Sequence, residues 1–175
     1  MSSARLRLKR IYTAVMMRIV GWGLRAMSRV DPVVRAEAAG FPDGIVIAMT
    51  TLPDGPSLVL QKTPAGHLRY LGGRLPAEGL GLAIRFKHLD YAFRVFAFIE
   101  STPTAFARAR MVVDGDLASG IRLVRCMYRL EALLMPRFIA ARGMKRYPED
   151  LGLGYKLGMN LKIYGRIALD LVTRT

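Results

Sequence analysis

The chain has 175 residues, of which 52% are hydrophobic and 23% are charged. It is therefore long enough to bury a core and too apolar for a disordered segment. A single cysteine excludes a disulfide framework and a cysteine-rich metal site, and it fits a reducing compartment. Residues 1–30 and 137–175 together carry 12 of the 14 net positive charges. We expect these two ends to favour anionic lipid or another polyanion.

The first predicted element is a basic amphipathic helix over residues 4–29. Its apolar side chains recur in steps of three and four, while its arginines lie on the opposite side. This pattern is typical of a helix that lies in a membrane interface. In the alternative interpretation, the apolar face docks on the domain and the arginines stay in water. The apolar face consists of Leu8, Ile11, Val15, Ile19, Trp22 and Ala26.

The membrane interpretation concerns the surface of a bilayer and not its interior. No apolar run reaches the roughly 18 residues that are needed to cross a bilayer. Arg18 interrupts the apolar run that follows the basic start, so we do not expect a signal peptide. The residues that we expect to contact the membrane are Arg7, Arg10, Arg18, Trp22 and Arg25.

Residues 31–140 are expected to form the main domain. Asp31 and Pro32 suit the N-cap and the first position of a short helix that ends before Gly40. Strand signals follow, as four short runs separated by turns that contain proline or glycine. Their close spacing predicts an antiparallel meander. The predicted strands cover 45–50, 58–61, 68–71 and 80–86, and helical spacing returns over 88–98 and 103–108.

A strand, a tight turn and a long helix are predicted next. Val112 and Val113 favour a half-buried strand. Gly115 permits the positive φ of a turn, and Asp116 is placed to cap the following helix. One face of this helix is apolar and should line an interior. The predicted bounds are 110–113 for the strand and 117–135 for the helix, which Pro136 ends.

Residues 141–175 are expected to form a basic C-terminal extension. A linker over 141–148 precedes helical spacing over 149–173. Several glycines interrupt this helical pattern, and basic residues lie on another side of it. The apolar face consists of Leu153, Leu157, Leu161, Tyr164, Ala168 and Leu171.

The sequence is poor in the groups that active sites need. It contains no G-x-S-x-G nucleophile elbow, no Walker loop and no metal-ligand spacing such as H-E-x-x-H. Cys126 lies within the long helix, where a small core residue is the favoured interpretation. Asp114 and Asp116 suit a turn and a cap better than a catalytic pair, and Arg74 suits a solvated loop better than a headgroup site. We therefore expect no catalytic, cofactor-binding or metal-binding residues and no enzymatic activity.

Several segments occur in a characteristic order between residues 43 and 136. Asp43-Gly44 stands before a strand, a segment from Ile84 to Lys87 leads into a helix, and the most specific piece, RMVVDGD, opens the long helix. This order resembles the sterol carrier protein-2 family of non-specific lipid-transfer domains. The L-L-M-P end of the long helix looks similar to bacterial ubiquinone-biosynthesis accessory proteins. The basic extensions at both ends are absent from the minimal domain of the family.

The resemblance implies an α+β fold in which a mostly antiparallel five-stranded sheet and helices enclose an apolar tunnel, with extra amphipathic helices at both ends. It also implies binding of a lipid, sterol, acyl chain or isoprenoid without a cofactor. We expect the ligand between the sheet and the helices at 88–98 and 117–135, although core packing is the default for any single residue. The candidates are Phe86, Leu89, Phe93, Phe96, Phe106, Met111, Val113, Ile121, Val124, Met127 and Tyr128.

The sequence thus predicts a non-catalytic protein that binds, transfers or presents an apolar ligand. We expect it in the cytoplasm, peripheral at the inner face of the membrane, with an anionic lipid surface as a partner. The alternative is an accessory or scaffold protein of quinone or isoprenoid biosynthesis that has enzyme partners. Nucleic-acid binding is disfavoured, because the basic residues alternate with apolar faces and no recognition motif accompanies them.

Overall fold

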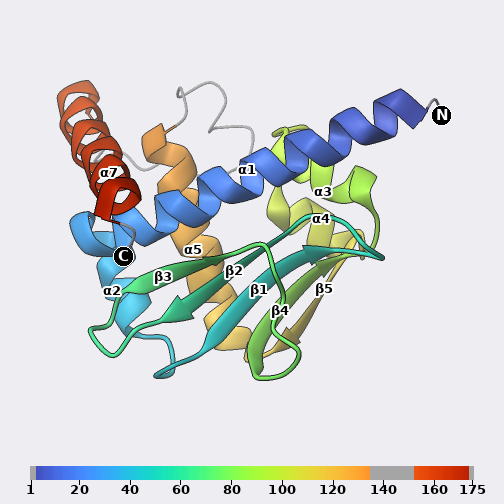
Figure 1. The fold of residues 1–175 in the computed structure, drawn as a ribbon, viewed down its shortest axis with the longest axis horizontal. Helices are drawn as coiled ribbons and strands as arrows, with labels where there is room; N and C mark the ends of the chain where they lie inside the picture. The colour runs from blue at the N-terminus through green and yellow to red at the C-terminus, as the bar shows by residue number, and fades with distance from the viewer. Residues whose placement is uncertain (1–2, 135–151, 174–175) are drawn as a thin grey trace.

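The structure is a computed structural model, and it describes residues 3–134 and 152–173. It has the expected α+β architecture, a five-stranded sheet covered by helices (Figure 1). The predicted linker, the helix end at Pro136 and the domain boundary at residue 140 lie outside the described residues. The elements are α1 (Ser3–Val30), α2 (Pro32–Ala39), β1 (Val46–Thr51), β2 (Ser57–Lys62), β3 (Leu68–Gly72), β4 (Leu80–Phe86), α3 (Leu89–Phe96), α4 (Thr102–Ala107), β5 (Met111–Gly115), α5 (Leu117–Leu134) and α7 (Leu153–Thr173).

The sheet has the strand order β3-β2-β1-β4-β5. β1, β2 and β3 form the predicted antiparallel meander, and β5 pairs antiparallel with β4. β4, however, pairs parallel with β1, so the prediction of a single four-stranded meander is wrong. The nearly continuous burial of β1 explains the difference, because a strand with so few exposed residues is stabilised by neighbours on both edges. The sheet is mixed and mostly antiparallel.

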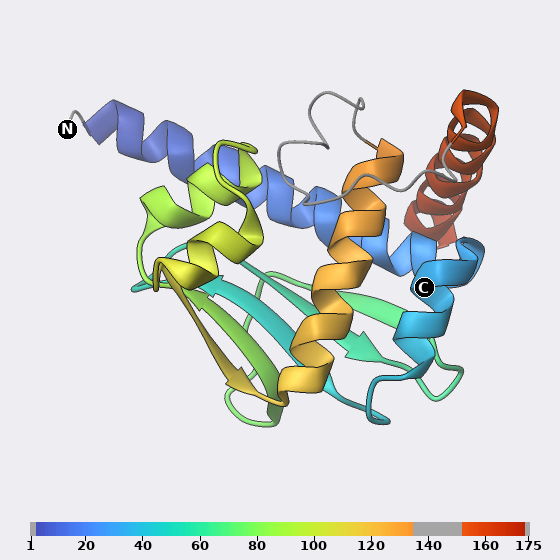
Figure 2. The ribbon, with the colours of Figure 1, turned by 180° about the vertical axis from the view of Figure 1, so that it is seen from behind.

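One hydrophobic core lies between the sheet and the helices. Ile47, Leu60 and Phe86 from three strands are fully buried and belong to the same cluster as Met17 of α1 and Leu123 of α5. Figure 2 shows α5 lying across the sheet while α1 runs along the top of the molecule. Because α1 supplies part of this core, it is an integral part of the folded domain and not a separate extension.

The junction between β5 and α5 has the geometry that Gly115 and Asp116 predict. Gly115 has a φ of 109°, and a Cβ there would lie 2.2 Å from the carbonyl oxygen of Gly81. Oδ2 of Asp116 accepts hydrogen bonds from the hydroxyl of Ser119 at 2.6 Å and from its amide at 2.8 Å. These bonds hold the pKa of Asp116 below its usual range. The turn and the cap together set the direction in which α5 leaves the sheet.

Replacing Gly115 by alanine should destabilise the protein more than the same change at Gly66. Both glycines need a positive φ, of 109° and 78°, but nothing lies within 4 Å of a Cβ at Gly66. We expect Gly66→Ala to lower the free energy of unfolding by about 1–2 kcal/mol. Gly115→Ala should lower it by about 3 kcal/mol or more, because the clash with the Gly81 carbonyl adds to the strain. Urea unfolding followed by circular dichroism measures both changes, and equal losses would contradict the clash.

α1 buries the side opposite to its predicted apolar face. Met17, Val20 and Leu24 pack inward, so this helix carries apolar residues on both sides and the second set fits against the sheet and its neighbours. The interpretation in which the predicted apolar face packs on the domain is therefore wrong for most of the length of α1. The exposed fractions are 69% for Leu8, 55% for Ile11, 48% for Val15 and 44% for Ile19, and we call these four residues the exposed ridge of α1.

Two arginines of α1, the buried Arg25 and the partly exposed Arg29, pair with a buried carboxylate. The Nε of Arg25, a residue that is only 4% exposed, donates to Oδ2 of Asp170 at 3.0 Å. Arg29 donates to Oδ1 of the same carboxylate at 3.3 Å, and Arg166 lies 3.2 Å from that oxygen. The structure contradicts the prediction that Arg25 contacts a membrane. Its position follows from the buried carboxylate, which needs cations beside it.

Asp170 should be required to hold α7 against α1. Asp170→Ala leaves Arg25 buried without a carboxylate, so we expect the free energy of unfolding to fall by about 3 kcal/mol. Glu78 is an exposed loop residue, and Glu78→Ala should change the same quantity by less than about 0.5 kcal/mol. Both values come from urea unfolding. Similar values for the two variants would show that the Asp170 cluster does not stabilise the fold.

α7 also turns its predicted apolar face outward. Leu157, Leu161 and Tyr164 are 63%, 77% and 57% exposed, whereas Met159 and Ile163 on the other side are buried in the core. The ion pairs of Asp170 lie on this buried side and fix the rotation of the helix. Among the described residues, no helix combines the length and the apolar character needed to cross a membrane.

Candidate functional site

A large apolar pocket lies between α4, β5 and the N-terminal half of α5. Its volume is about 380 Å³, which lies in the range of small-molecule sites. Apart from Thr102, Arg125 and the hydroxyl of Tyr128, the side chains around it are apolar. We call it the large pocket, and its lining consists of Ile84, Thr102, Pro103, Phe106, Met111, Val113, Leu117, Gly120, Ile121, Val124, Arg125 and Tyr128.

The large pocket is a groove open to solvent. Phe106, Leu117 and Ile121 in its lining are 53%, 63% and 49% exposed, so the described residues do not close over it. Within the described residues, the large pocket is thus open and lies beside α4, whereas the expected site was between 88–98 and 117–135. α4, and not α3, forms the wall opposite α5, because α3 packs against α1 through Phe93 and Tyr12.

The sequence explains how the walls of the large pocket form. Val113 lines the pocket, while Val112, its neighbour on β5, points to the other face of the sheet and is 43% exposed. Gly120 has no side chain, and a Cβ there would lie 3.6 Å from Val113, so α5 comes close to β5 at this point. Ser101 caps the short helix α4, and its hydroxyl accepts a hydrogen bond from the amide of Thr104 at 3.3 Å.

A buried carboxylate holds the α4 wall in place. Glu100 is 7% exposed and precedes α4. Its Oε1 accepts from Arg108 at 3.0 Å, and its Oε2 accepts from Arg110, directly before β5. Arg94 of α3 lies 3.6 Å from Oε2. Three arginines around one carboxylate connect α3, α4 and β5, and such charged hydrogen bonds restrict the shape of the wall.

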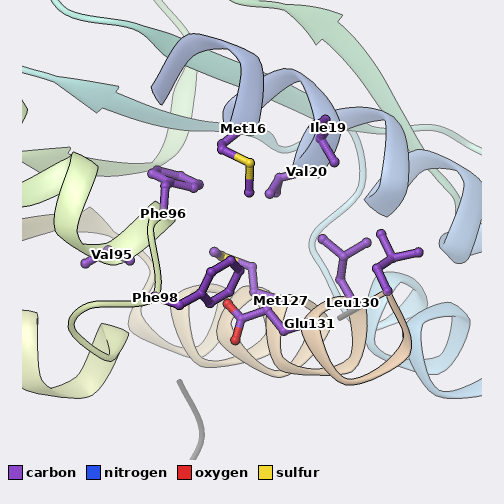
Figure 3. Close-up of a pocket in the computed structure, with 10 residues that line it drawn as sticks. Met16, Ile19, Val20, Val95, Phe96, Phe98, Met127, Leu130 and Glu131 are labelled. Carbon is purple, nitrogen blue, oxygen red and sulfur yellow. The ribbon is translucent and has the colours of Figure 1, made fainter. Parts of the chain in front are cut away.

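A small pocket follows the large one along α5 (Figure 3). Its volume is about 30 Å³. Glu131 is the charged residue of its lining, and Figure 3 shows the carboxylate beside the ring of Phe98. Oε2 of Glu131 is buried and has no hydrogen-bond partner among the described residues, and burial raises the pKa of the carboxyl to about 7. The lining consists of Met16, Ile19, Val20, Val95, Phe96, Phe98, Met127, Leu130, Glu131 and Leu134.

The two pockets bring together eight of the eleven predicted ligand-contact residues. Phe96 and Met127 line the small pocket. Phe86 is fully buried beneath them, with its ring 6.0 Å from that of Phe96. Leu89 and Phe93 are half-buried on α3 and line neither pocket. The six that line the large pocket are Phe106, Met111, Val113, Ile121, Val124 and Tyr128.

The residues of α1 that were predicted to contact the membrane fall into an exposed group toward its N-terminus and a buried or half-buried group toward its C-terminus. Arg7, Arg10 and Arg18 are exposed. Trp22 is half-buried, with its ring edge-on to Tyr70 at 5.6 Å between centroids. Together with the buried Arg25, this places the C-terminal part of the helix in the interior and its N-terminal part at the surface.

Several residues that line the pockets were not predicted from the sequence, although a sequence pattern could have identified two of them. Ile84 pairs directly with Val113 across β4 and β5, so correct strand pairing would have identified it. Glu131 stands three residues after Tyr128 and four after Met127, which places a lone acid on the apolar face of α5. Leu117 directly follows the cap residue, where no periodic pattern marks it.

The described residues offer little for nucleophilic or metal chemistry. Within them, no cluster of three histidine, cysteine, aspartate or glutamate side chains could hold a metal ion. Cys126 is fully buried, which raises the pKa of its thiol to about 12 and keeps it from forming the reactive thiolate. Asp114 accepts from Arg85 at 2.7 Å, while Asp116 caps α5. Both aspartates therefore have structural partners.

The fold is similar to that of sterol carrier protein-2 domains. The structure of the UbiJ-SCP2 ubiquinone synthesis protein aligns with 70% of this chain and 98% of its own, at 13% identity and a TM-score of 0.47. A conserved hypothetical protein from Thermus thermophilus aligns over 74% and 90%, at 15% identity and a TM-score of 0.44. Sterol carrier protein 2 like 2 from Aedes aegypti aligns over 54% and 93%, at 9% identity and a TM-score of 0.34. No family model and no curated protein matches the sequence.

These low identities and TM-scores indicate only a distant similarity in backbone fold. The ligand and the activity of this protein have to follow from its own residues, above all from those that line the two pockets.

Proposed function

We propose that this protein binds an apolar chain, such as an acyl or isoprenoid chain, in the large pocket without chemically changing it. The observation that supports this proposal is a groove of about 380 Å³ whose lining is almost wholly apolar. Each methylene group removed from water contributes about 0.8 kcal/mol, so a chain of several carbons binds without specific polar contacts. The absence of a reactive group among the lining residues favours binding or transfer over catalysis.

A pair of neighbouring valines on β5 tests this proposal. Val113→Trp places an indole in the large pocket, whereas Val112→Trp places the same group on the exposed face of the sheet. We expect Val113→Trp to weaken binding of a fluorescent fatty acid at least about tenfold, and Val112→Trp to change it less than about twofold. Fluorescence titration gives both affinities, and urea unfolding confirms that the variants are folded. Equal affinities would place the ligand elsewhere.

We further propose that the exposed ridge of α1 brings the protein to the surface of an anionic membrane. The ridge consists of large aliphatic side chains, and the exposed Arg7 and Arg18 lie on the same part of the helix. Apolar side chains beside arginines are the pattern of an interfacial helix, and each cation near an anionic surface adds about 1 kcal/mol. The single buried cysteine suits a reducing compartment, which favours the cytoplasmic face of the membrane.

Charges placed on the ridge should abolish membrane binding. Deleting residues 1–30 is unsuitable as a test, because α1 forms part of the core. Ile11→Glu with Val15→Glu should instead lower the fraction that floats with phosphatidylglycerol vesicles by at least about fivefold. Val33 and Leu71 are 43% and 42% exposed and lie outside α1, so Val33→Glu with Leu71→Glu is the matched control. If both double variants float alike, the ridge does not bind membranes.

A second candidate function is that of an accessory protein in quinone or isoprenoid biosynthesis. The outward face of α7 favours it, because Leu157, Leu161 and Tyr164 are exposed and follow the steps of three and four that pair helices. A ubiquinone synthesis protein is also among the structures with a similar fold. Copurification of a quinone- or isoprenoid-pathway enzyme with the wild-type chain, but not with Leu157→Glu and Leu161→Glu, would favour this role over free lipid carriage.

A further inference from the structure

Glu131 is the polar group of an otherwise apolar pocket. It projects from α5 toward α1 and toward the end of α3, and Figure 3 shows it opposite Met16 and beside Phe98. Its Oε2 is buried and accepts no hydrogen bond from any described residue. A buried polar group without a partner is costly, so this oxygen is placed to meet a partner that the described residues do not supply.

A water molecule is a poor partner for this carboxyl. The small pocket, of about 30 Å³, has room for one or two waters. Buried waters, however, typically make about three hydrogen bonds, and Glu131 is the polar side chain among those that line the pocket. An apolar ligand with a single hydrogen-bond acceptor fits this pocket better than a water molecule does.

The surroundings favour the neutral form of Glu131 near pH 7. Burial raises its pKa to about 7, and no neighbouring charge contributes to this shift. From α1 and the α3 segment, the lining presents only apolar side chains, and Tyr128 on α5 is the titratable neighbour that interacts with it. A neutral carboxyl can donate a hydrogen bond, whereas a carboxylate can only accept.

The small pocket lies between the two surfaces of the proposed function. Tyr128, one helical turn from Glu131, lines the large pocket. Ile19 belongs both to the exposed ridge of α1 and to the lining of the small pocket. Met16 and Met127 in the same lining are flexible enough to admit a larger group. Glu131 therefore lies one helical turn beyond Tyr128, the residue of the large pocket that is nearest to it along α5.

We propose that the small pocket receives a carbonyl group at the end of the bound apolar ligand, and that the protonated Glu131 donates a hydrogen bond to this carbonyl oxygen. The class of ligand is thus an apolar chain with a ketone, ester or quinone carbonyl. This inference rests on the proposed binding of an apolar chain, and it adds a polar selectivity that the large pocket lacks.

A ketone and an alkane of equal length test the inference. We measure how 2-undecanone and undecane displace N-phenyl-1-naphthylamine from the full chain at about pH 6 and about pH 8.5, on either side of the Glu131 pKa of about 7. At the lower pH, the ketone should bind about five- to tenfold more tightly than the alkane, as expected for one hydrogen bond. At the higher pH, this preference should fall toward unity.

Two variants of Glu131 separate the effect of its hydrogen-bond donor from the effect of the shape of the pocket. Glu131→Gln keeps a donor at every pH, so the preference for the ketone should persist at both values. Glu131→Met removes the donor and keeps an apolar side chain, so both ligands should bind alike. An unchanged ketone preference in Glu131→Met would overturn the inference. Equal binding of both ligands to the wild-type chain would also overturn the inference, but it would leave the proposed function intact. Failure of both ligands to bind would overturn the proposed function itself.

A ligand-free measurement checks the buried carboxyl independently. The pKa of Glu131 rises from its ordinary 4.5 to about 7 in the folded chain. The folded protein therefore keeps a proton that the unfolded chain has lost, and this contribution to stability disappears as the pH rises through that window. The urea midpoint of the wild-type chain should fall with rising pH more steeply than that of Glu131→Gln. Identical slopes would show that Glu131 is not buried as a neutral acid and would overturn the inference.

Discussion

The burial of one side of α1 fixes how this helix, the core and α7 are arranged. Met17, Val20 and Leu24 complete the core that the sheet and α5 leave open, and Arg25 ties α7 to the same helix. With that side fixed, the opposite side must face outward, whatever its composition. The exposed ridge is therefore a consequence of the packing. A single helix thereby closes the core, holds the C-terminal helix and supplies an apolar surface next to the small pocket.

The positive charge of this chain serves two purposes that composition alone does not separate. Some arginines surround buried carboxylates. Asp31 accepts from Arg129 at 3.1 Å, Glu100 has three arginines around it, and Asp170 has three more. These internal pairs connect α2 with α5, α3 with the α4–β5 segment, and α1 with α7. Other described cations, such as the exposed Arg7 and Arg18, lie at the surface, where they can attract an anionic membrane. The net charge of +14 already subtracts these carboxylates, so the pairing changes where the cations lie and not their sum.

Local signals predicted the elements well, and the failures have a common physical cause. Strand runs, the Gly115 turn and the Asp116 cap depend on residues close in sequence, and each was predicted correctly. The parallel pairing of β4 with β1, the inward side of α1 and the position of Arg25 depend on contacts between distant segments. For the site, helical and strand periodicity identified most of the pocket lining on β5 and α5. It could not identify α4 as the opposite wall, or the isolation of Glu131, because both follow from how whole elements pack.

The buried position of Cys126 has a practical consequence. The side chain is fully inaccessible and its thiol stays protonated near neutral pH, so it should not compete with a surface cysteine for maleimide reagents. A spin label or fluorophore can therefore be attached at a chosen position without first removing the native cysteine. Labels on α1 and α7 would report separately on bilayer depth and on protein proximity, which turns an inert core residue into an advantage for following this molecule at a membrane.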